Sequence, residues 1–504
     1  MTATEVRSEM WSELLDGWRA RRLRSAAVAV MGVGWGVLVA QAPFMVVVPA
    51  LLLLGVLLVG HPQTATTLAI VLLFSNAGVI AVKYHGLPGL AAGVLPLLLC
   101  ITLAHRVFVE HRGLVVPHAM PWLVVFTIVQ AVGTVASRDP QLSSVALHTF
   151  LVEGFALYLL VVNTVRSFEA LRLAAVALVL TAGALGALTL FQEATHSNSS
   201  RYGGFAQMSK ATIDTSHGRT GRQRHAGAIG EQNRWAQCLV LAVPVAIAIG
   251  TRDRSKTMRI VAWTSLAGIA SGIVLTYSRG AAVGLGITLL VAVLLRWVKP
   301  WVGVASAVGA VILLAIFAPA FLGRASTLVN SGDQNADPFA ATAPDSSITN
   351  RSTEAAAAAA VFGRHPVVGV GTGLFPTYFQ VQARTQGASR IVGVNREAHD
   401  LYLGLAAETG ALGLGSFCGF AIATVRACGT VRRRPLGGRE DVAALVTGFA
   451  LSVVAYLATG LFLHFAYIRY FWLFAALAAA AAIVGREPAP AGGRAPTMEV
   501  ARHG

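Results

Sequence analysis

The chain has 504 residues, of which 55% are hydrophobic and 12% are charged, and its formal net charge is +16. Soluble globular proteins carry about 25% charged residues, so this composition excludes an ordinary soluble domain. Apolar runs recur along the whole chain at the length that a bilayer requires. We therefore predict an all-α, polytopic helical membrane protein. We attribute its positive charge to membrane orientation and to contact with membrane lipids, not to a nucleic-acid partner.

Hydropathy predicts about 12–14 transmembrane helices of roughly 17–24 residues each. The two longest polar segments lie between them and are predicted to be extracytoplasmic loops, the second of them partly helical. The candidate spans are 26–41, 44–60, 63–82, 87–104, 119–137, 145–164, 172–192, 234–250, 260–277, 281–295, 303–322, 401–425, 441–463 and 470–485.

These spans and loops divide the chain into seven parts. They are a basic cytoplasmic N-terminus (1–25), an N-terminal transmembrane bundle (26–192), a first outer loop (193–233), central transmembrane helices (234–322), a large outer loop (323–400), C-terminal transmembrane helices (401–485) and a cytoplasmic tail (486–504).

The placement of Lys and Arg orients this arrangement. These residues gather in 251–259 and 426–440, whereas the short connections on the other side hold only Lys83, Arg138, Arg279 and Arg469. Cytoplasmic loops carry the excess of positive charge in membrane proteins. We therefore expect a multi-pass protein of the cytoplasmic (inner) membrane with both termini in the cytoplasm and the two long loops outside.

The first outer loop is rich in Ser, Gly, Thr and Arg, and it ends with Arg224 and Asn233 just before a span. Its basic content suits an anion such as a diphosphate or a lipid headgroup. A solvated loop near anionic lipid is the alternative, and composition does not separate the two.

Tyr277-Ser278-Arg279-Gly280 joins two spans with almost no connecting residues. This places Arg279 at or just below the outer membrane surface, where a charge is costly and usually marks function. Snorkelling of its side chain to the headgroups is the alternative.

The second outer loop contains a helical segment over 351–362, for which Asn350 is a candidate N-cap and Gly363 with Pro366 the stop. Glu354 follows Arg351 by one turn on the same face, which predicts an ion pair between them. The glycine-rich run 367–373 resembles a dinucleotide fingerprint, but it has no βαβ unit around it, so we reject that interpretation.

His399 stands where this loop meets an apolar helix. Histidine changes its charge near neutral pH, so at a membrane boundary it can take a proton from an acceptor in water. A capping or interfacial histidine is the alternative. Asp400 could orient His399, bind a sugar hydroxyl or cap the helix. Glu408 lies about 180° around an ideal helix from His399, which favours a pairing role inside the bundle.

Taken together, these residues resemble the O-antigen ligase and O-antigen polymerase superfamily of bacterial membrane glycosyltransferases. Similarity covers roughly residues 150–425 and is carried by four signatures in the order of the family. They are Arg224-x-x-Gly227 with Asn233; Ser278-Arg279-Gly280; Arg351 leading to His365-Pro366-x-x-Gly369-Val370-Gly371; and Ala398-His399-Asp400-x-Tyr402-Leu403 leading to Glu408-x-Gly410-x-x-Gly413. The family usually has Asn where this chain has Asp400.

The resemblance implies an enzyme that transfers a glycan from an undecaprenyl-diphosphate carrier to a glycan or glycolipid acceptor, on the outer face of the cytoplasmic membrane. It implies His399 as general base and Arg279 and Arg351 as the arginines that match the charge of the diphosphate.

Arg224, Asn233, Asp400, Tyr402 and Glu408 are the substrate-binding candidates. The chain contains no Asp-x-Asp motif, so we expect a metal-independent mechanism without a cofactor.

The sequence leaves two activities of this class open. A ligase attaches a finished glycan to a different acceptor, whereas a polymerase uses another lipid-linked glycan as acceptor. A transporter of lipid-linked glycans is a third possibility. It would need polar residues through the middle of several spans, and here the ionisable residues gather at the predicted outer ends.

Overall fold

The computed structural model describes residues 61–87, 98–213, 222–299, 301, 346–385, 396–433, 439–464 and 468–486. Side chains are described for most of these, but not for 210–213, 222, 346–353, 380 and 382–385. The predicted spans 26–41, 44–60 and 303–322, both terminal segments and most of 330–349 lie outside the described residues. All that follows concerns the unit that begins at Pro62.

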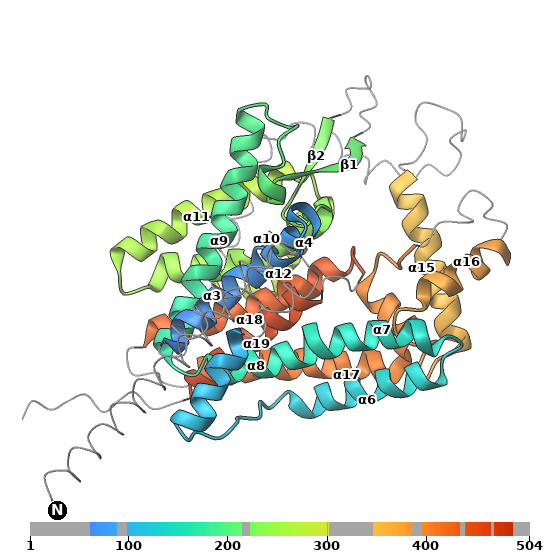
Figure 1. Cartoon of the computed structure of the whole chain (residues 1–504), viewed down its shortest axis with the longest axis horizontal. Coiled ribbons are helices and arrows are strands. Elements are labelled where there is room, and N and C mark those ends of the chain that lie inside the picture. The colour runs from blue at the N-terminus through green and yellow to red at the C-terminus, as the bar shows by residue number, and fades with distance from the viewer. Residues whose placement is uncertain are drawn as a thin grey trace, which may run out of the picture. The chain divides into compact units, whose positions relative to one another are not determined.

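Helices make up most of the described chain, as predicted (Figure 1). Six are long and apolar enough to cross a membrane, or seven if the bent pair α3–α4 counts as one span. The helices are α3 (Pro62–Phe74), α4 (Ala77–His85), Leu98–Val109, α6 (Met120–Ala136), α7 (Pro140–Phe150), α8 (Leu157–Thr164), α9 (Phe168–Ala194), α10 (Gln232–Arg252), α11 (Lys256–Leu275), α12 (Arg279–Leu294), α15 (Ser346–Arg364), α16 (Phe375–Thr385), α17 (Leu401–Arg432), α18 (Glu440–Gly460) and α19 (Arg469–Val484).

Each predicted span that falls on described residues overlaps one of these helices, but three of the spans are interrupted. One of them is the span predicted at 401–425, where Gly410 leaves the helical conformation. The span predicted at 63–82 bends by 57° between α3 and α4, where Asn76 adopts a left-handed conformation. The span predicted at 145–164 combines α7, a π-helical turn (Leu151–Ala156) and α8. Hydropathy is averaged over a window of residues, so the polar Ser75, Asn76 and Glu153 at these breaks do not remove the apolar signal.

The helices pack closely where small residues meet. α9 lies along α11, and α10 lies between α11 and α18. A Cβ atom on Gly186 would come within 2.2 Å of the carbonyl oxygen of Gly268, so only glycine lets α9 and α11 approach this closely. Such small-residue contacts are typical of helix packing in membranes.

The polar segments define two ends of the unit. Arg224, Arg279, His399 and His464 lie at one end, which we call the motif end. Arg252, Arg254, Glu440 and Asp441 lie at the other, which we call the ion-pair end, because Arg252 contacts Glu440 and Arg254 contacts Asp441. The residues that charge placement assigns to the same side of the membrane therefore lie together.

Both long loops contain more regular structure than the sequence predicts. The first holds an antiparallel pair of strands, β1 (Gln207–Ile213) and β2 (Arg222–Gly227), in which Met208 pairs with His225. β2 packs against α9, α10 and α11. In the second loop, α15 confirms the predicted helix but includes residues 346–350. Asn350 therefore lies inside the helix and the prediction that it is the N-cap was wrong.

Candidate functional site

The first and second signatures meet through Arg224. Its guanidinium is buried, and it donates to the carbonyl oxygens of Thr276 at 2.8 Å and Tyr277 at 3.2 Å. It also donates to Oδ1 of Asn233 at 3.0 Å. Arg224 and Asn233, both predicted to bind substrate, are thus engaged in holding the turn that precedes Arg279.

This turn is shaped to present Arg279. Tyr277 is buried in a left-handed conformation with φ 52°, which costs free energy for a residue with a side chain. Ser278 caps α12 by accepting a hydrogen bond from the Ala281 amide. Arg279 is the first residue of α12 and is half-buried. The strained turn and the two hydrogen bonds that it accepts from Arg224 fix where the Arg279 side chain begins.

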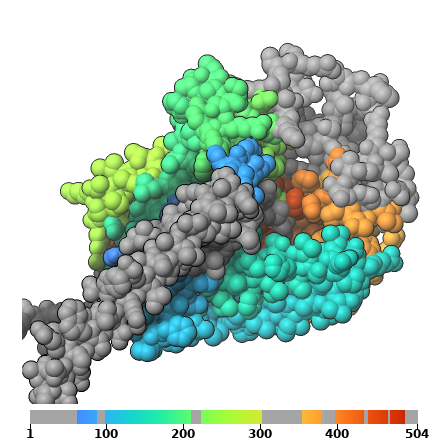
Figure 2. All heavy atoms as spheres, viewed as in Figure 1, coloured from blue at the N-terminus to red at the C-terminus, as the bar shows by residue number. Residues whose placement is uncertain are grey.

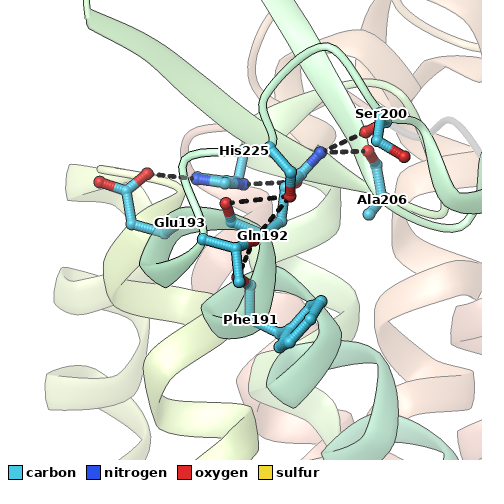
Figure 3. Close-up of polar contacts among 8 residues, drawn as sticks. Phe191, Gln192, Glu193, Ser200, Ala206 and His225 are labelled. Atoms are coloured by element: carbon cyan, nitrogen blue, oxygen red, sulfur yellow. Dashed lines mark hydrogen bonds and ion pairs between the residues drawn. The ribbon is translucent and has the colours of Figure 1, made fainter.

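A buried histidine fastens the strand that carries Arg224 (Figure 3). His225 on β2 contacts Oε1 of Gln192 through Nδ1 and Oε2 of Glu193 through Nε2, both at 2.9 Å. Gln192 in turn donates to the carbonyl oxygens of Ser200 and Ala206. The end of α9 therefore organises the first loop, and β2 cannot move without breaking this network.

The third and fourth signatures meet at a carboxylate–histidine pair. Oε2 of Glu354 on α15 lies 2.8 Å from Nδ1 of His399, and Oε1 accepts a hydrogen bond from Arg396 at 3.2 Å. Glu354 is only 1% exposed, whereas the side chain of His399 is 36% exposed. A carboxylate on Nδ1 holds the proton there and leaves Nε2 as the basic nitrogen. Nε2 has no hydrogen-bond partner among the described residues.

The predicted partner of Glu354 was Arg351. The structure instead gives Glu354 two other partners, Arg396 and His399, which are 42 and 45 residues away along the chain. The side chain of Arg351 lies outside the described residues, so its pairing with Glu354 and its convergence with Arg279 stay predictions. Its backbone lies in α15, one turn before Glu354.

A main-chain joint fixes the glycine-rich turn on the start of α17. The amides of Val370 and Gly371 donate to the carbonyl oxygens of Ala407 and Glu408, and the amides of Ala411 and Leu412 donate to those of Pro366 and Val367. We call this contact between 366–371 and 407–412 the glycine joint. It anchors the helix that begins just after His399.

Two glycines allow this approach. Gly410 interrupts the helix with φ 65° and Gly369 has φ 70°, both in the left-handed region that favours glycine. A Cβ atom on Gly369 would lie 2.3 Å from the carbonyl carbon of Glu408, and one on Gly410 would lie 2.2 Å from the carbonyl oxygen of Val367. Glu408 accepts a hydrogen bond from the Phe375 amide at 3.3 Å, which agrees with a pairing role.

The glycine-rich turn also rests on the N-terminal helices. A Cβ on Gly133 of α6 would meet the Val368 carbonyl oxygen, and one on Gly371 would meet Ser137. In Figure 2 the cyan atoms of α6 and α7 adjoin the orange atoms of the second loop. The turn is thus held between α6, α7 and α17.

Asp400 and Tyr402 have structural partners of their own. Asp400 caps α17 by accepting the Leu403 amide at 2.8 Å, which is one of its predicted roles. Burial raises the pKa of the Asp400 carboxyl. The Tyr402 hydroxyl donates to the Leu457 carbonyl oxygen on α18 at 2.9 Å. Both residues position the first turn of α17, directly behind His399.

Sequence reasoning missed two residues beside His399. The ring of His464 lies 5.6 Å from that of His399 at an angle of 77°. Arg234, buried on the first turn of α10, donates through Nη1 to the carbonyl oxygen of His464. Gly280, next to Arg279, packs against Phe462. The segment 461–464 at the end of α18 therefore links the arginine turn to the histidine.

No pattern in the sequence marks these two residues, because Arg234 directly follows a signature and His464 stands alone after a span. The one available signal was that Arg234 places a charge at the end of a predicted span, where a charge is energetically costly and often functional. No three His, Cys, Asp or Glu side chains lie close enough to hold a metal ion in the part of the chain that the structure describes.

Comparison with known proteins agrees with the motifs. Residues 264–418 match a family model described as O-antigen ligase, and this segment contains the second, third and fourth signatures. The first signature, at 224–233, precedes the matched segment. No protein with a curated description matches the chain. The match over residues 264–418 confirms the resemblance to the O-antigen ligase superfamily drawn from the sequence.

Proposed function

We propose that this protein transfers a glycan from an undecaprenyl-diphosphate carrier to the hydroxyl of a glycan or glycolipid acceptor. The single observation that carries the proposal is the buried Glu354 on Nδ1 of His399. This contact leaves Nε2 as the basic nitrogen of a side chain that is 36% exposed. The segment 461–464, whose His464 lies against His399, also packs against Gly280 next to Arg279. The O-antigen ligase match supports the same class of reaction.

In the proposed mechanism, Nε2 of His399 removes the proton of the acceptor hydroxyl as its oxygen attacks the anomeric carbon. The bond from that carbon to the diphosphate oxygen breaks, and the configuration at the carbon inverts. Arg279 and Arg351 bind the diphosphate and match the charge that develops on it, since guanidinium groups fit phosphate oxygens in pairs. The proton then leaves His399 for solvent. The diphosphate is a good leaving group by itself, so we propose a metal-independent reaction.

Arg224 and Asn233 act indirectly in this scheme. Arg224 donates to the carbonyl oxygens of Thr276 and Tyr277, and Asn233 accepts from Arg224, so together they position Arg279 for the diphosphate. Asp400, Tyr402 and Glu408 fix the start of α17 and so position His399.

The proposed location is the outer face of the cytoplasmic membrane, with both termini inside. The clustering of Arg279, His399 and His464 at the motif end supports this, because the substrates would meet at one end of the helices. Cysteines placed at Ser200 and at Ser255, probed in intact cells with an impermeant thiol reagent, test it. We expect labelling at position 200 alone; labelling at position 255 would show the opposite orientation.

Reconstitution of the purified chain with an undecaprenyl-diphosphate-linked glycan tests the activity directly. We expect release of undecaprenyl diphosphate together with glycan transfer, unchanged by a chelator. A protein that moves the donor across a vesicle membrane without cleaving it would be a transporter instead.

A ligase and a polymerase differ in what accumulates when the protein is absent. Single lipid-linked repeat units in a deletion strain indicate a polymerase, and finished lipid-linked chains indicate a ligase. The His399–Glu354 pair serves the same chemistry in both cases, and we favour the ligase because the family description names that activity.

A further inference from the structure

Arg234 is a buried cation without a counter-ion among the described residues. It is 3% exposed, and its side chain makes one hydrogen bond, from Nη1 to the carbonyl oxygen of His464. Nη2 is buried and has no partner in the described part of the chain. Buried charges in proteins are normally paired, because leaving one unpaired is strongly destabilising.

The nearest carboxylates do not fill this role. Both oxygens of Glu231 are used to cap α10, where they accept from Asn233 and from the Arg234 amide. Glu397 is close enough for Arg234 to lower its pKa, although burial outweighs this and raises that pKa overall. It forms no ion pair with Arg234. The N-terminus of α10 adds a positive partial charge at the same place.

His464 supplies a second buried polar atom without a partner. Nδ1 has no hydrogen-bond partner among the described residues, and the ring lies against His399. Burial, together with the charges of Arg234 and His399, lowers the pKa of His464 far below its usual value. Arg234 donates to the carbonyl oxygen of His464. Nη2 of Arg234 and Nδ1 of His464 therefore both lie near His399, the proposed general base.

We propose that Arg234 and His464 form an anion subsite beside His399 that binds a phosphate or carboxylate oxygen of a substrate. The anion neutralises the guanidinium and takes a hydrogen bond from Nη2, while Nδ1 of His464 donates a second one. The anion belongs either to the donor diphosphate or to an acidic sugar of the acceptor. Only this attribution to a substrate rests on the proposed function; the subsite itself does not.

Anion binding to the purified full-length chain in detergent tests the proposal without any need for turnover. The thermal unfolding midpoint is followed against pyrophosphate, which represents the donor, and against glucuronate, which represents an acidic sugar. Glucose and sodium chloride at matched ionic strength are the neutral and salt controls. We expect the unfolding midpoint to rise saturably with at least one of the two anions and to stay unchanged with the controls.

The matched variants are Arg234→Gln and, at the ion-pair end, Arg172→Gln. Loss of a charge-assisted hydrogen bond should weaken binding by about tenfold or more in Arg234→Gln, while Arg172→Gln should bind as the parent does. A loss confined to glucuronate assigns the subsite to the acceptor, and a loss for pyrophosphate assigns it to the donor.

His464→Phe keeps a ring against His399 and removes both nitrogens, so it tests the subsite even if Arg234→Gln does not fold. This variant should lower the affinity for the same anion by at least about threefold. No saturable response of the parent protein to either anion would overturn the proposal, as would parental affinity in Arg234→Gln or in His464→Phe. Anion binding that depends on Arg234 in a protein that transfers no glycan would leave the subsite standing and remove the proposed function.

Discussion

The two ends of the helices use arginine in different ways. At the ion-pair end, Arg172 donates to both carboxylate oxygens of Asp253, at 2.7 and 2.8 Å. At the motif end, Arg224 and Arg234 donate instead to main-chain carbonyl oxygens. A carbonyl oxygen carries a partial charge only, so it orients a guanidinium without neutralising it.

This contrast suggests a division of roles. Neutralised arginines tie helix ends together, as Arg252 on α10 does by contacting Glu440 on α18. At the motif end, Arg234 donates to the carbonyl oxygen of His464, whose ring lies against His399. Two arginines near this end also pair with carboxylates, since Arg396 contacts Glu354 and Arg469 contacts Glu153, both at 3.2 Å. Substitutions at the two ends should therefore have different consequences.

The largest expected effect is at Arg279 and Arg351. Replacement of either by Ala should abolish transfer while the unfolding midpoint stays near that of the parent, because each contributes charge stabilisation worth about 10²–10³-fold or more. Lys should restore little activity, because it lacks the planar fork. Rates of undecaprenyl diphosphate release measure this. Full activity in both Lys variants would mean that charge alone matters at these positions.

Next in size is His399→Ala, which should slow the chemical step by about 10²–10⁴-fold. The arginines that bind the donor are untouched, so donor affinity should remain. Single-turnover rates and donor binding separate the two. Asp253→Asn at the ion-pair end is the control and should lower stability but not the rate. A well-folded His399→Ala protein with the parental rate would shift the role of base to Asp400.

A smaller loss is expected in Glu354→Gln. The amide cannot hold the proton on Nδ1 as the carboxylate does, so we expect about a 10²-fold fall in turnover with little change in the KM for either substrate. Glu354→Asp should recover part of the rate. Both variants could instead lose stability while each folded molecule keeps the parental rate. That outcome would show that Glu354 stabilises the packing of α15 and does not assist His399.

The smallest effect concerns stability against pH. The folded protein keeps the pKa of His464 below the ordinary value of about 6.5. The unfolded chain therefore takes up a proton as the pH falls below about 6.5, whereas the folded chain does not, so stability is lost on acidification. In His464→Gln, the unfolding midpoint should change less with pH between about pH 7.5 and 5.5 than it does in the parent. His196→Gln, which alters an exposed histidine, should keep the parental slope.

Hydropathy was sufficient to predict the helices, since their apolar content is local information. It could not predict β1 and β2, because residues such as Gln207, Lys210 and Arg222 give no apolar alternation. The site divides in the same way. Motif spacing placed Arg279 and His399 at one end, but the pairing of His399 with Glu354 depends on how α15 docks against α17. Contacts between segments so far apart leave no periodic trace.

Arg234 and His464 were missed for a related reason. Each is a single residue that stands out because it has a buried nitrogen with no hydrogen-bond partner among the described residues. Burial and missing partners can be seen in a structure, whereas the residue type alone does not reveal them. The same holds for Glu231, whose carboxylate is occupied by the cap of α10.

The glycine joint has a consequence for how this protein tolerates sequence change. Its hydrogen bonds run between main-chain amides and carbonyls, which every residue other than proline supplies in full. The joint therefore needs no particular side chain for its hydrogen bonds. Gly369, Gly371 and Gly410 nevertheless have positive φ, and a Cβ atom on each would collide with a neighbour, while Val370 and Ala407 are buried in the core. A comprehensive substitution library should show that these three glycines accept no other residue, whereas the exposed Val367 accepts many, a pattern that would report on backbone docking and not on chemistry.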